Sequence, residues 1–393
     1  MGLRTLLTII GALVASLGVT MLLPAVADLA SGNENWRVFV AASFVTTLSG
    51  AGLWASSSGR VETLTLRQAF LLTTLIWTVL TFFGSLPLLW SDLGFSFTDA
   101  IFEAMAGFTT TGSTVLTGLD HRPPGVLLWR GMMQWFGGLG IVVMAIAVLP
   151  ALQVGGMQMF KAESFETPDK ILPKAGQIAG GMSVAYVVLT ALCGIGYWYF
   201  GMPPFDAAIH AMTTLATGGF STSDSGLQAF AAPGIDYVAI VFMLMAATPF
   251  ALFVGAVQQG RWDRLFGNSQ VQGFYLVVAV VSAFVIVTLV SSGQFFGEEA
   301  VRVSVFAVVN IMTGTGFTSL DNGSWGTFTT FVFFVLMFVG GCTGSTSCGI
   351  KIFRFQVLAR DLYQHVSRIL TPSRIYIKRY NGAPLPDAVS TSV

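Results

Sequence analysis

The chain has 393 residues, of which 54% are hydrophobic and 10% are charged, and its mean hydropathy is +0.74. An ordinary soluble protein carries about 25% charged residues, so the composition excludes a disordered, nucleic-acid-binding or ordinary cytosolic protein. The 19 basic and 19 acidic residues cancel to a formal net charge of zero. The three cysteines, Cys193, Cys342 and Cys348, form no C-x-x-C pair, which argues against a disulfide framework or a zinc site.

The apolar residues gather in segments long enough to cross a membrane, which takes about 20 residues each. This rule predicts eight spans, near 5–27, 36–57, 66–90, 126–150, 178–200, 236–257, 271–292 and 327–350. Three semi-polar helices between them, at 98–109, 204–215 and 299–312, are too short to cross. We expect the first span to be retained, because the apolar run from Leu6 to Leu23 exceeds the usual h-region of about 7–15 residues in a cleaved signal.

The basic residues indicate the orientation, because cytoplasmic segments are enriched in Lys and Arg. With the N-terminus in the cytoplasm, 15 of the 19 basic residues lie inside, and only Arg37, Arg122, Arg130 and Arg302 lie outside. The same orientation places 7 acidic residues inside and 12 outside. We therefore predict a cytoplasmic N-terminus and a negative outer surface.

A turn rich in Gly and Thr follows each of the three short helices. Its central glycines, Gly112, Gly219 and Gly316, are 107 and then 97 residues apart, which indicates an internal repeat. A single turn of this kind is as readily explained by an ordinary loop as by a functional site, because Gly and Thr are common between helices. Three copies, each after a half-length helix and before a return span, are typical of a re-entrant pore loop. Polar backbone at membrane depth survives only where it is buried in protein or lines a cavity.

The chemistry of these turns favours a monovalent cation. A cation filter replaces lost hydration with backbone carbonyl oxygens, and glycine reaches the backbone conformations that aim carbonyls at an axis. The turns contain no Asp or Glu, which argues against a carboxylate ring for a divalent ion. The acids that begin the short helices are expected to be caps favoured by the helix dipole rather than ligands: Asp99, Asp206, Glu298 and Glu299.

Two longer strings carry a family resemblance. GFTTTGSTVLT at 107–117 and QWFGGLG at 134–140 resemble the Trk/Ktr/HKT superfamily of potassium transporters, and most closely its bacterial Trk membrane subunits. ATGGFST at 216–222 and GGCTGST at 340–346 fit the same subunits. The resemblance implies potassium uptake across the bacterial inner membrane, with K⁺ as the transported ion and no covalent cofactor. It also implies a membrane homodimer in lipid, bound to a cytosolic nucleotide-binding regulatory subunit.

The fold that this resemblance implies is an all-α polytopic membrane protein with a pore like that of a potassium channel. Residues 1–60 would form a two-span prefix. Three repeats, each a span, a pore helix, a filter loop and a second span, would follow at 61–155, 156–265 and 266–355. Residues 356–393 would be a cytoplasmic linker or tail. The resemblance places the filter at nine residues: Thr110, Thr111, Gly112, Thr217, Gly218, Gly219, Gly314, Thr315 and Gly316.

A segment of small and polar residues interrupts the eighth span at 340–351. Such residues would break a helix in mid-membrane, which indicates a cavity lining. By resemblance this segment is a flexible gate beneath the filter, with these candidate residues: Gly340, Gly341, Gly344, Ser345, Thr346, Gly349 and Lys351. Small residues could instead allow close helix packing, and Lys351 could face the pore or the inner interface.

A fourth filter glycine would fall near position 413–423 by the observed spacing, beyond Val393. We therefore expect a truncated form that does not conduct alone. A non-conducting structural or regulatory membrane subunit is one alternative. A secondary cation transporter with broken helices is another, although it would show two inverted halves. An enzyme is disfavoured, because the chain has no G-x-S-x-G motif and no histidine paired with a nucleophile.

Overall fold

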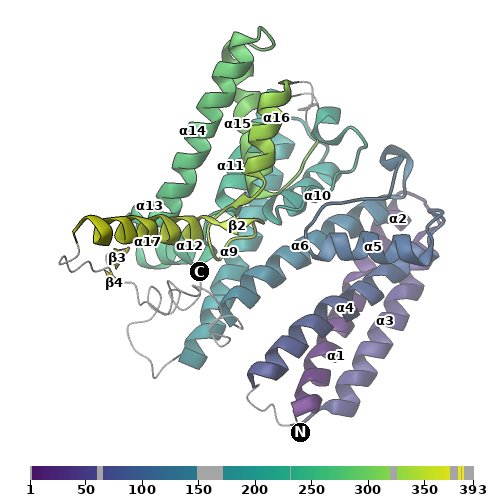
Figure 1. Ribbon diagram of the computed structural model, residues 1–393. Helices are drawn as coiled ribbons and strands as arrows, with labels where there is room; N and C mark the ends of the chain where they lie inside the picture. The colour runs from purple at the N-terminus through teal and green to yellow at the C-terminus, as the bar shows by residue number, and fades with distance from the viewer. Residues whose placement is uncertain are drawn as a thin grey trace.

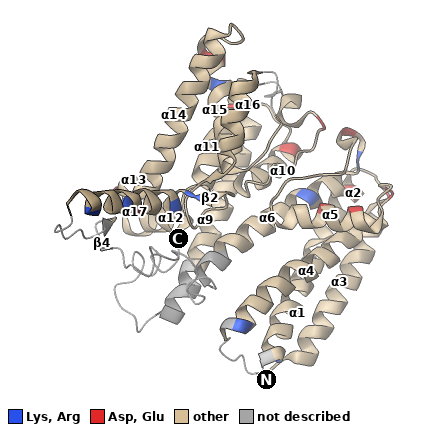
Figure 2. Ribbon diagram, in the orientation of Figure 1, with Lys and Arg blue, Asp and Glu red and all other residues tan. Residues whose placement is uncertain are grey.

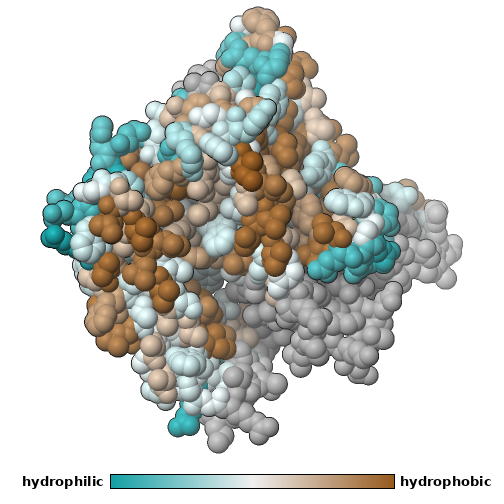
Figure 3. Space-filling model, turned by 180° about the vertical axis from the view of Figure 1, so that it is seen from behind, coloured by the Kyte–Doolittle hydropathy of each residue, from teal (hydrophilic) through white to brown (hydrophobic). Residues whose placement is uncertain are grey.

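The computed structural model describes residues 2–59, 65–147, 171–230, 232–318, 325–371, 379–381 and 383–384, and these are mainly helical (Figure 1). Among them, five helices are long and apolar enough to cross a membrane, or six if the bent pair α11–α12 forms one span. Figure 3 shows apolar side chains across much of one face, with hydrophilic ones gathered at its margins. The predicted all-α polytopic class is therefore confirmed.

The N-terminal part consists of α1 (Gly2–Thr20), α2 (Leu22–Ala30) and α3 (Trp36–Ser57). Helices α1 and α3 pack closely, because a Cβ added to Gly11 would lie 2.5 Å from the Trp54 backbone nitrogen. A Cβ on Gly50 would lie 2.2 Å from the Ala15 nitrogen. Small residues at such crossings let two backbones approach in the way that membrane helices favour.

Three similar groups of elements follow in chain order. The first contains α4 (Leu66–Trp90), α5 (Phe97–Phe108), η1 (Leu119–His121) and α6 (Pro124–Ala147). The second contains α9 (Ile171–Tyr199), α10 (Pro204–Leu215), η3 (Gly226–Phe230), α11 (Pro233–Ala246), α12 (Phe250–Gln259) and α13 (Trp262–Gly267). The third contains α14 (Ser269–Ser291), α15 (Gly297–Thr313), α16 (Thr327–Leu336), β1 (Val339–Gly340), β2 (Ile350–Lys351) and α17 (Ile352–Leu370), and β3 (Arg379–Tyr380) and β4 (Ala383–Pro384) form a small antiparallel pair.

The half-length helices α5, α10 and α15 lie within two residues of their predicted bounds. A capping box begins α5, in which the Asp99 amide donates to the Ser96 hydroxyl at 3.2 Å and the Asp99 carboxylate accepts from the Ser96 amide at 3.0 Å. Acids also occupy the first turns of α10 and α15, where the dipole favours them. In Figure 2 the ribbon is coloured red for acidic residues toward the ends where these helices begin.

The predicted span at 236–257 is not one continuous helix, which corrects that prediction. Helix α11 ends at Ala246, α12 begins at Phe250, and the two are bent by 89°. Pro249 explains the break, because proline lacks an N–H and disfavours a helical conformation in the residue before it. Likewise α16 ends at Leu336, short of the interruption predicted at 340.

An apolar core joins the helices of the second and third groups, and a second cluster joins α2, α3 and the first group. The predicted divisions at 60–61 and 155–156, and positions 148–150 of the fourth span, lie outside the described residues. Those at 265–266 and 355–356 fall within α13 and α17. The division into repeats stays a prediction.

Candidate ion filter and gate

The three Gly/Thr-rich turns (turn 1, 109–114; turn 2, 216–222; turn 3, 313–318) share one backbone pattern. In each turn, the residue two positions before the central glycine has a positive φ: Thr110 at 54°, Thr217 at 51° and Gly314 at 74°. The central glycines, Gly112, Gly219 and Gly316, all have a φ of 76°. The residue between these two positions does not have a positive φ in any of the three turns. Alternating handedness turns successive N–H groups to one side of the chain and carbonyls to the other. A threonine held in this region costs about 1–3 kcal/mol, and such strain concentrates at functional sites.

The three turns converge on one another. A Cβ added to Gly112 would lie 2.1 Å from the Gly218 carbonyl oxygen and 3.8 Å from that of Thr315. A Cβ added to Gly219 would lie 1.9 Å from the Thr315 oxygen. Because these contacts involve backbone atoms, only glycine fits at Gly112 and Gly219. Among the residues that the structure describes, none has an atom within 4 Å of a Cβ added to Gly316.

Two buried amide side chains hold turns 2 and 3. From α6, Gln134 donates to the Gly218 carbonyl at 2.7 Å and accepts from the Phe220 amide at 3.1 Å. From α15, Asn310 donates to the Phe317 carbonyl and accepts from its amide, both at 2.8 Å. Each amide thus fixes its turn through both its oxygen and its nitrogen. These roles were not predicted from the sequence, although a polar amide inside an apolar helix is a signal, since buried polar groups require partners.

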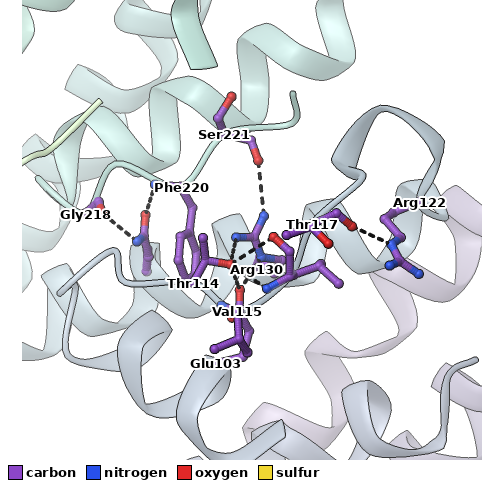
Figure 4. Close-up of polar contacts among 11 residues, drawn as sticks. Glu103, Thr114, Val115, Thr117, Arg122, Arg130, Gly218, Phe220 and Ser221 are labelled. Atoms are coloured by element: carbon purple, nitrogen blue, oxygen red, sulfur yellow. Dashed lines mark hydrogen bonds and ion pairs between the residues drawn. The ribbon is translucent and has the colours of Figure 1, made fainter. Parts of the chain in front are cut away.

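A buried ion pair lies behind turn 1 (Figure 4). Arg130 on α6 donates to the Glu103 carboxylate on α5 at 2.7 Å, and their side chains are 1% and 0% exposed. Glu103 also accepts from the Thr114 hydroxyl at 2.8 Å and from the Val115 amide at 3.0 Å. The carboxylate therefore anchors the segment that leaves turn 1.

The same arginine reaches turn 2. Its guanidinium donates to the Ser221 carbonyl at 3.2 Å and lies 4.1 Å from the centre of the Phe220 ring (Figure 4). Arg130 thereby links the first two turns through one charged group. From the sequence, Arg130 was predicted only to lie in the outer half of the protein, although an ionisable residue within a membrane segment is itself a sign of function.

Further bonds join the segments that follow turns 1 and 2 to one another and to the end of turn 3. Asp224 accepts from the backbone amides of Gly118 and Leu119 at 3.1 and 3.0 Å. The Leu227 amide donates to the Thr318 carbonyl at 3.0 Å. His210 is buried among aromatic rings, with its Nε2 3.0 Å from the Ser221 hydroxyl and its Nδ1 2.8 Å from the Asp206 carbonyl.

The candidate gate residues lie in one compact loop whose ends are paired. Strands β1 and β2 are parallel, with Val339 opposite Ile350 and Gly340 opposite Lys351. Gly344 and Gly349 have φ of 82° and 77°, a conformation that favours glycine at both turns. A Cβ on Gly340 would lie 1.9 Å from the Cys348 carbonyl oxygen.

Side chains and amides within the loop bond to one another. The Ser345 hydroxyl donates to the Cys342 carbonyl at 2.6 Å, and the Gly341 amide donates to the Ser347 hydroxyl at 2.8 Å. The Lys351 ammonium donates to the Ser347 carbonyl, so this lysine folds back onto the loop.

This loop lies directly against the ends of two half-length helices. The Thr346 hydroxyl donates to the Leu215 carbonyl at 3.0 Å, and the Cys348 amide donates to the Thr313 carbonyl at 3.1 Å. Leu215 ends α10 immediately before turn 2, and Thr313 is both the last residue of α15 and the first of turn 3. A Cβ on Gly314 would lie 2.8 Å from the Cys348 Cβ, so the loop contacts turn 3 as well.

The arrangement matches a known family. Residues 36–393 match the family model TrkH, described as a cation transport protein. The chain belongs to the TrkH family. This membership confirms the resemblance to Trk transporters and places the chain among membrane transport proteins.

Named relatives of this TrkH-family chain include potassium uptake proteins of Halomonas elongata. It is 42% identical to the Trk system potassium uptake protein TrkI over 327 residues, which are 83% of this chain and 66% of TrkI. It is 35% identical to the Trk system potassium uptake protein TrkH, covering 100% of this chain and 82% of that relative. The crystal structure of the potassium transporter TrkH from Vibrio parahaemolyticus superposes with a TM-score of 0.91 at 33% identity, covering 100% of this chain and 82% of that one. These relatives bear the names of transporters, not of enzymes.

Proposed function

We propose that this chain takes part in potassium uptake, and that its three turns form part of the ion filter. The observation that carries the proposal is the convergence of three turns with the same alternating backbone, in which Gly112 approaches carbonyl oxygens of both other turns. Carbonyl oxygens can replace the hydration shell of K⁺. The printed names of the relatives, Trk system potassium uptake proteins, support the choice of ion.

The filter would work because its oxygens are held in place before the ion arrives. Backbone carbonyls of the predicted filter residues would face the ion. Gln134 holds turn 2 through the Gly218 carbonyl and Asn310 holds turn 3 through the Phe317 carbonyl. The C-terminal ends of α5, α10 and α15 precede the turns. The negative ends of their dipoles would stabilise a cation beneath the filter. Because no atom of the described residues lies within 4 Å of a Cβ added to Gly316, a further loop beside it would close the proposed ring.

The loop at 340–351 would be the gate of this path. Its bonds to the Leu215 and Thr313 carbonyls support that role, since they hold the loop under turns 2 and 3. Opening would break these bonds and release the helix ends toward the cavity. By resemblance the chain would lie in the bacterial inner membrane with a cytoplasmic N-terminus. It would form a homodimer and bind a cytosolic nucleotide-binding regulatory subunit.

The test uses a bacterial strain that lacks potassium uptake, with growth at low K⁺ and ⁸⁶Rb⁺ uptake as readouts. One plasmid encodes this chain, and a second encodes a chimera of this chain followed by the part of the Halomonas TrkH that lies beyond the matched region. We expect uptake by the chimera, which supplies a loop beside Gly316. If neither protein transports Rb⁺ although both reach the membrane, the proposed filter is refuted.

The alternative of a non-conducting structural or regulatory subunit makes a different prediction in the same test. If this chain is such a subunit, the chimera would reach the membrane but would not transport Rb⁺, whatever residue occupies position 219. In the proposed filter, Gly219→Ala in the chimera abolishes uptake because its Cβ would lie 1.9 Å from the Thr315 carbonyl oxygen.

A further inference from the structure

Helix α17 presents three distinct faces. One face is buried in the protein and contains Ile352, Phe353, Val357 and Gln364. A second face is apolar but exposed, with Leu358, Leu362 and Ile369 at 65%, 64% and 71% exposure. The third is polar and exposed, and contains Arg354, His365 and Arg368. An apolar stripe beside a basic one is the pattern of a helix that lies in the plane of a membrane surface.

The contacts of the buried face place α17 at the end of a membrane span. The Gln356 side chain donates to the Ser269 carbonyl at 2.6 Å, and Ser269 begins the span α14. A Cβ on Gly273 would lie 2.2 Å from Gln356 Nε2. At about 1.5 Å per residue, Gly273 is about 6 Å from that end of α14. Figure 1 shows α17 running across this end of α14.

The distance of about 6 Å from the end of α14 agrees with the depth of interfacial helices, whose apolar faces enter a bilayer by about 5–10 Å. Helix α13, which precedes α14, carries a similar mixture at the same level. Trp262 and Phe266 are exposed there, next to Arg261 and Arg264. Tryptophan and arginine together are typical of the interface between acyl chains and headgroups.

We propose that α17 lies in the membrane–water interface, with Leu358, Leu362 and Ile369 among the acyl chains and with Arg354 and Arg368 on anionic phospholipid headgroups. The proposal rests on the cytoplasmic orientation given under the proposed function, because the cytoplasmic leaflet carries the anionic lipids. Charge complementarity and the depth on α14 favour lipid over a second copy of the chain or a soluble partner as the occupant of this face.

The position of α17 connects the lipid surface to the candidate gate. Ile352, its first residue, directly follows β2, and the Ile352 amide donates to the Gly341 carbonyl at 3.2 Å. A helix held by lipid would therefore fix the end of the gate loop. Lipid charge would then influence the gate without touching the filter.

Spin labels can test the depth of α17. A single cysteine is placed at Leu362, on the apolar face, or at His365, on the polar face, in a Cys348→Ser background, since Cys348 is the exposed one of the three cysteines. Leu276, exposed on α14, supplies the matched control within a span. Each labelled protein is reconstituted in phosphatidylcholine vesicles with or without phosphatidylglycerol. Relaxation by oxygen, which enters lipid, is compared with relaxation by a nickel chelate, which stays in water.

We expect the oxygen-to-nickel accessibility ratio at position 362 to be several-fold higher than at 365 and close to that at 276. With phosphatidylglycerol present, the double variant R354Q/R368Q should lower the ratio at 362 and leave that at 276 unchanged. A ratio at 362 as low as at 365 would show a solvated face and overturn the proposal. So would shielding from both reagents with spin–spin broadening, which would indicate a second copy, or insensitivity to phosphatidylglycerol and to the arginines. None of these readouts requires ion uptake, so they separate this proposal from the proposed function.

Discussion

Replacement of Arg130 by methionine gives the sharpest test of how the turns are held. The change keeps an unbranched side chain but removes the charge that pairs with Glu103 at 2.7 Å and the donors to Thr114 and Ser221. Removing one partner of a buried ion pair costs about 3–5 kcal/mol, because the other charge stays buried without compensation. Glu103 keeps its bonds from Thr114 and Val115, which puts the expected loss of stability near the lower end, at about 3 kcal/mol.

The measurement is thermal unfolding of the protein in detergent, in K⁺ and in Na⁺. Arg130→Met should lower stability and also abolish any extra stabilisation by K⁺, because turns 1 and 2 lose their link. The double variant E103Q/R130M should be less destabilised than the sum of the single variants, by about 2 kcal/mol, because no unpaired charge remains. Arg122→Met is the control, since Arg122 is only partly buried and its side chain donates to the Thr117 carbonyl at 3.1 Å.

Additive single effects, or equal stability of Arg130→Met and Arg122→Met, would refute the view that this ion pair holds the turns. Loss of stability without loss of the K⁺ effect would show a structural role that is separate from the filter.

Three further predictions concern the filter and gate in the complete pore of the chimera, measured by ⁸⁶Rb⁺ uptake. Gly219→Ala should abolish uptake, because its Cβ would lie 1.9 Å from the Thr315 carbonyl oxygen. Gly316→Ala should retain more uptake, because its Cβ would meet no atom of the described residues within 4 Å. Gln134→Leu leaves buried backbone groups of turn 2 unpaired, which costs about 1–3 kcal/mol, and should weaken discrimination against competing Na⁺. Thr346→Val removes a hydroxyl that holds the gate loop on α10 and should raise basal uptake.

Each of these has a result that would contradict it. Equal uptake by the two alanine variants would mean that the close approach of turns 2 and 3 is unimportant. Unchanged Na⁺ competition in Gln134→Leu would remove the role of the amide in selectivity. A Thr346→Val protein with normal or lower basal uptake would argue that the loop is not held closed by this bond.

Local signals were sufficient where an element is defined by its own residues. The spans at 36–57 and 66–90 match the observed helices, and Thr65 and Gln68 form a capping box that begins the second of them. The half-length helices were found because three semi-polar segments, each too short to cross a membrane, are each followed by a Gly- and Thr-rich turn. The bend at Pro249 was missed even though proline is its signal, since the apolar run continues past it and outweighed the break.

Partners distant in the chain could not be predicted from one sequence. Arg130 bonds to residues that are 27 and 91 positions away, and Thr346 bonds to one that is 131 positions away. Helix α16 ends at Leu336 within an unbroken apolar run, where the chain enters the pairing of Val339 with Ile350. No local residue signals that ending. The charges and amides inside apolar helices did indicate positions of interest, but not which turn each one holds.

The three turns share a backbone but not a sequence, because Thr110 and Thr217 occupy the position that Gly314 fills in turn 3. All three belong to one polypeptide, so in the proposed filter a single codon change alters one turn and leaves the other two as they were. In an assembly of identical subunits the same change would strike every wall at once. Mutations in a TrkH-family gene can thus change the proposed filter one turn at a time. Selection can keep a strained threonine in turns 1 and 2 and an unstrained glycine in turn 3.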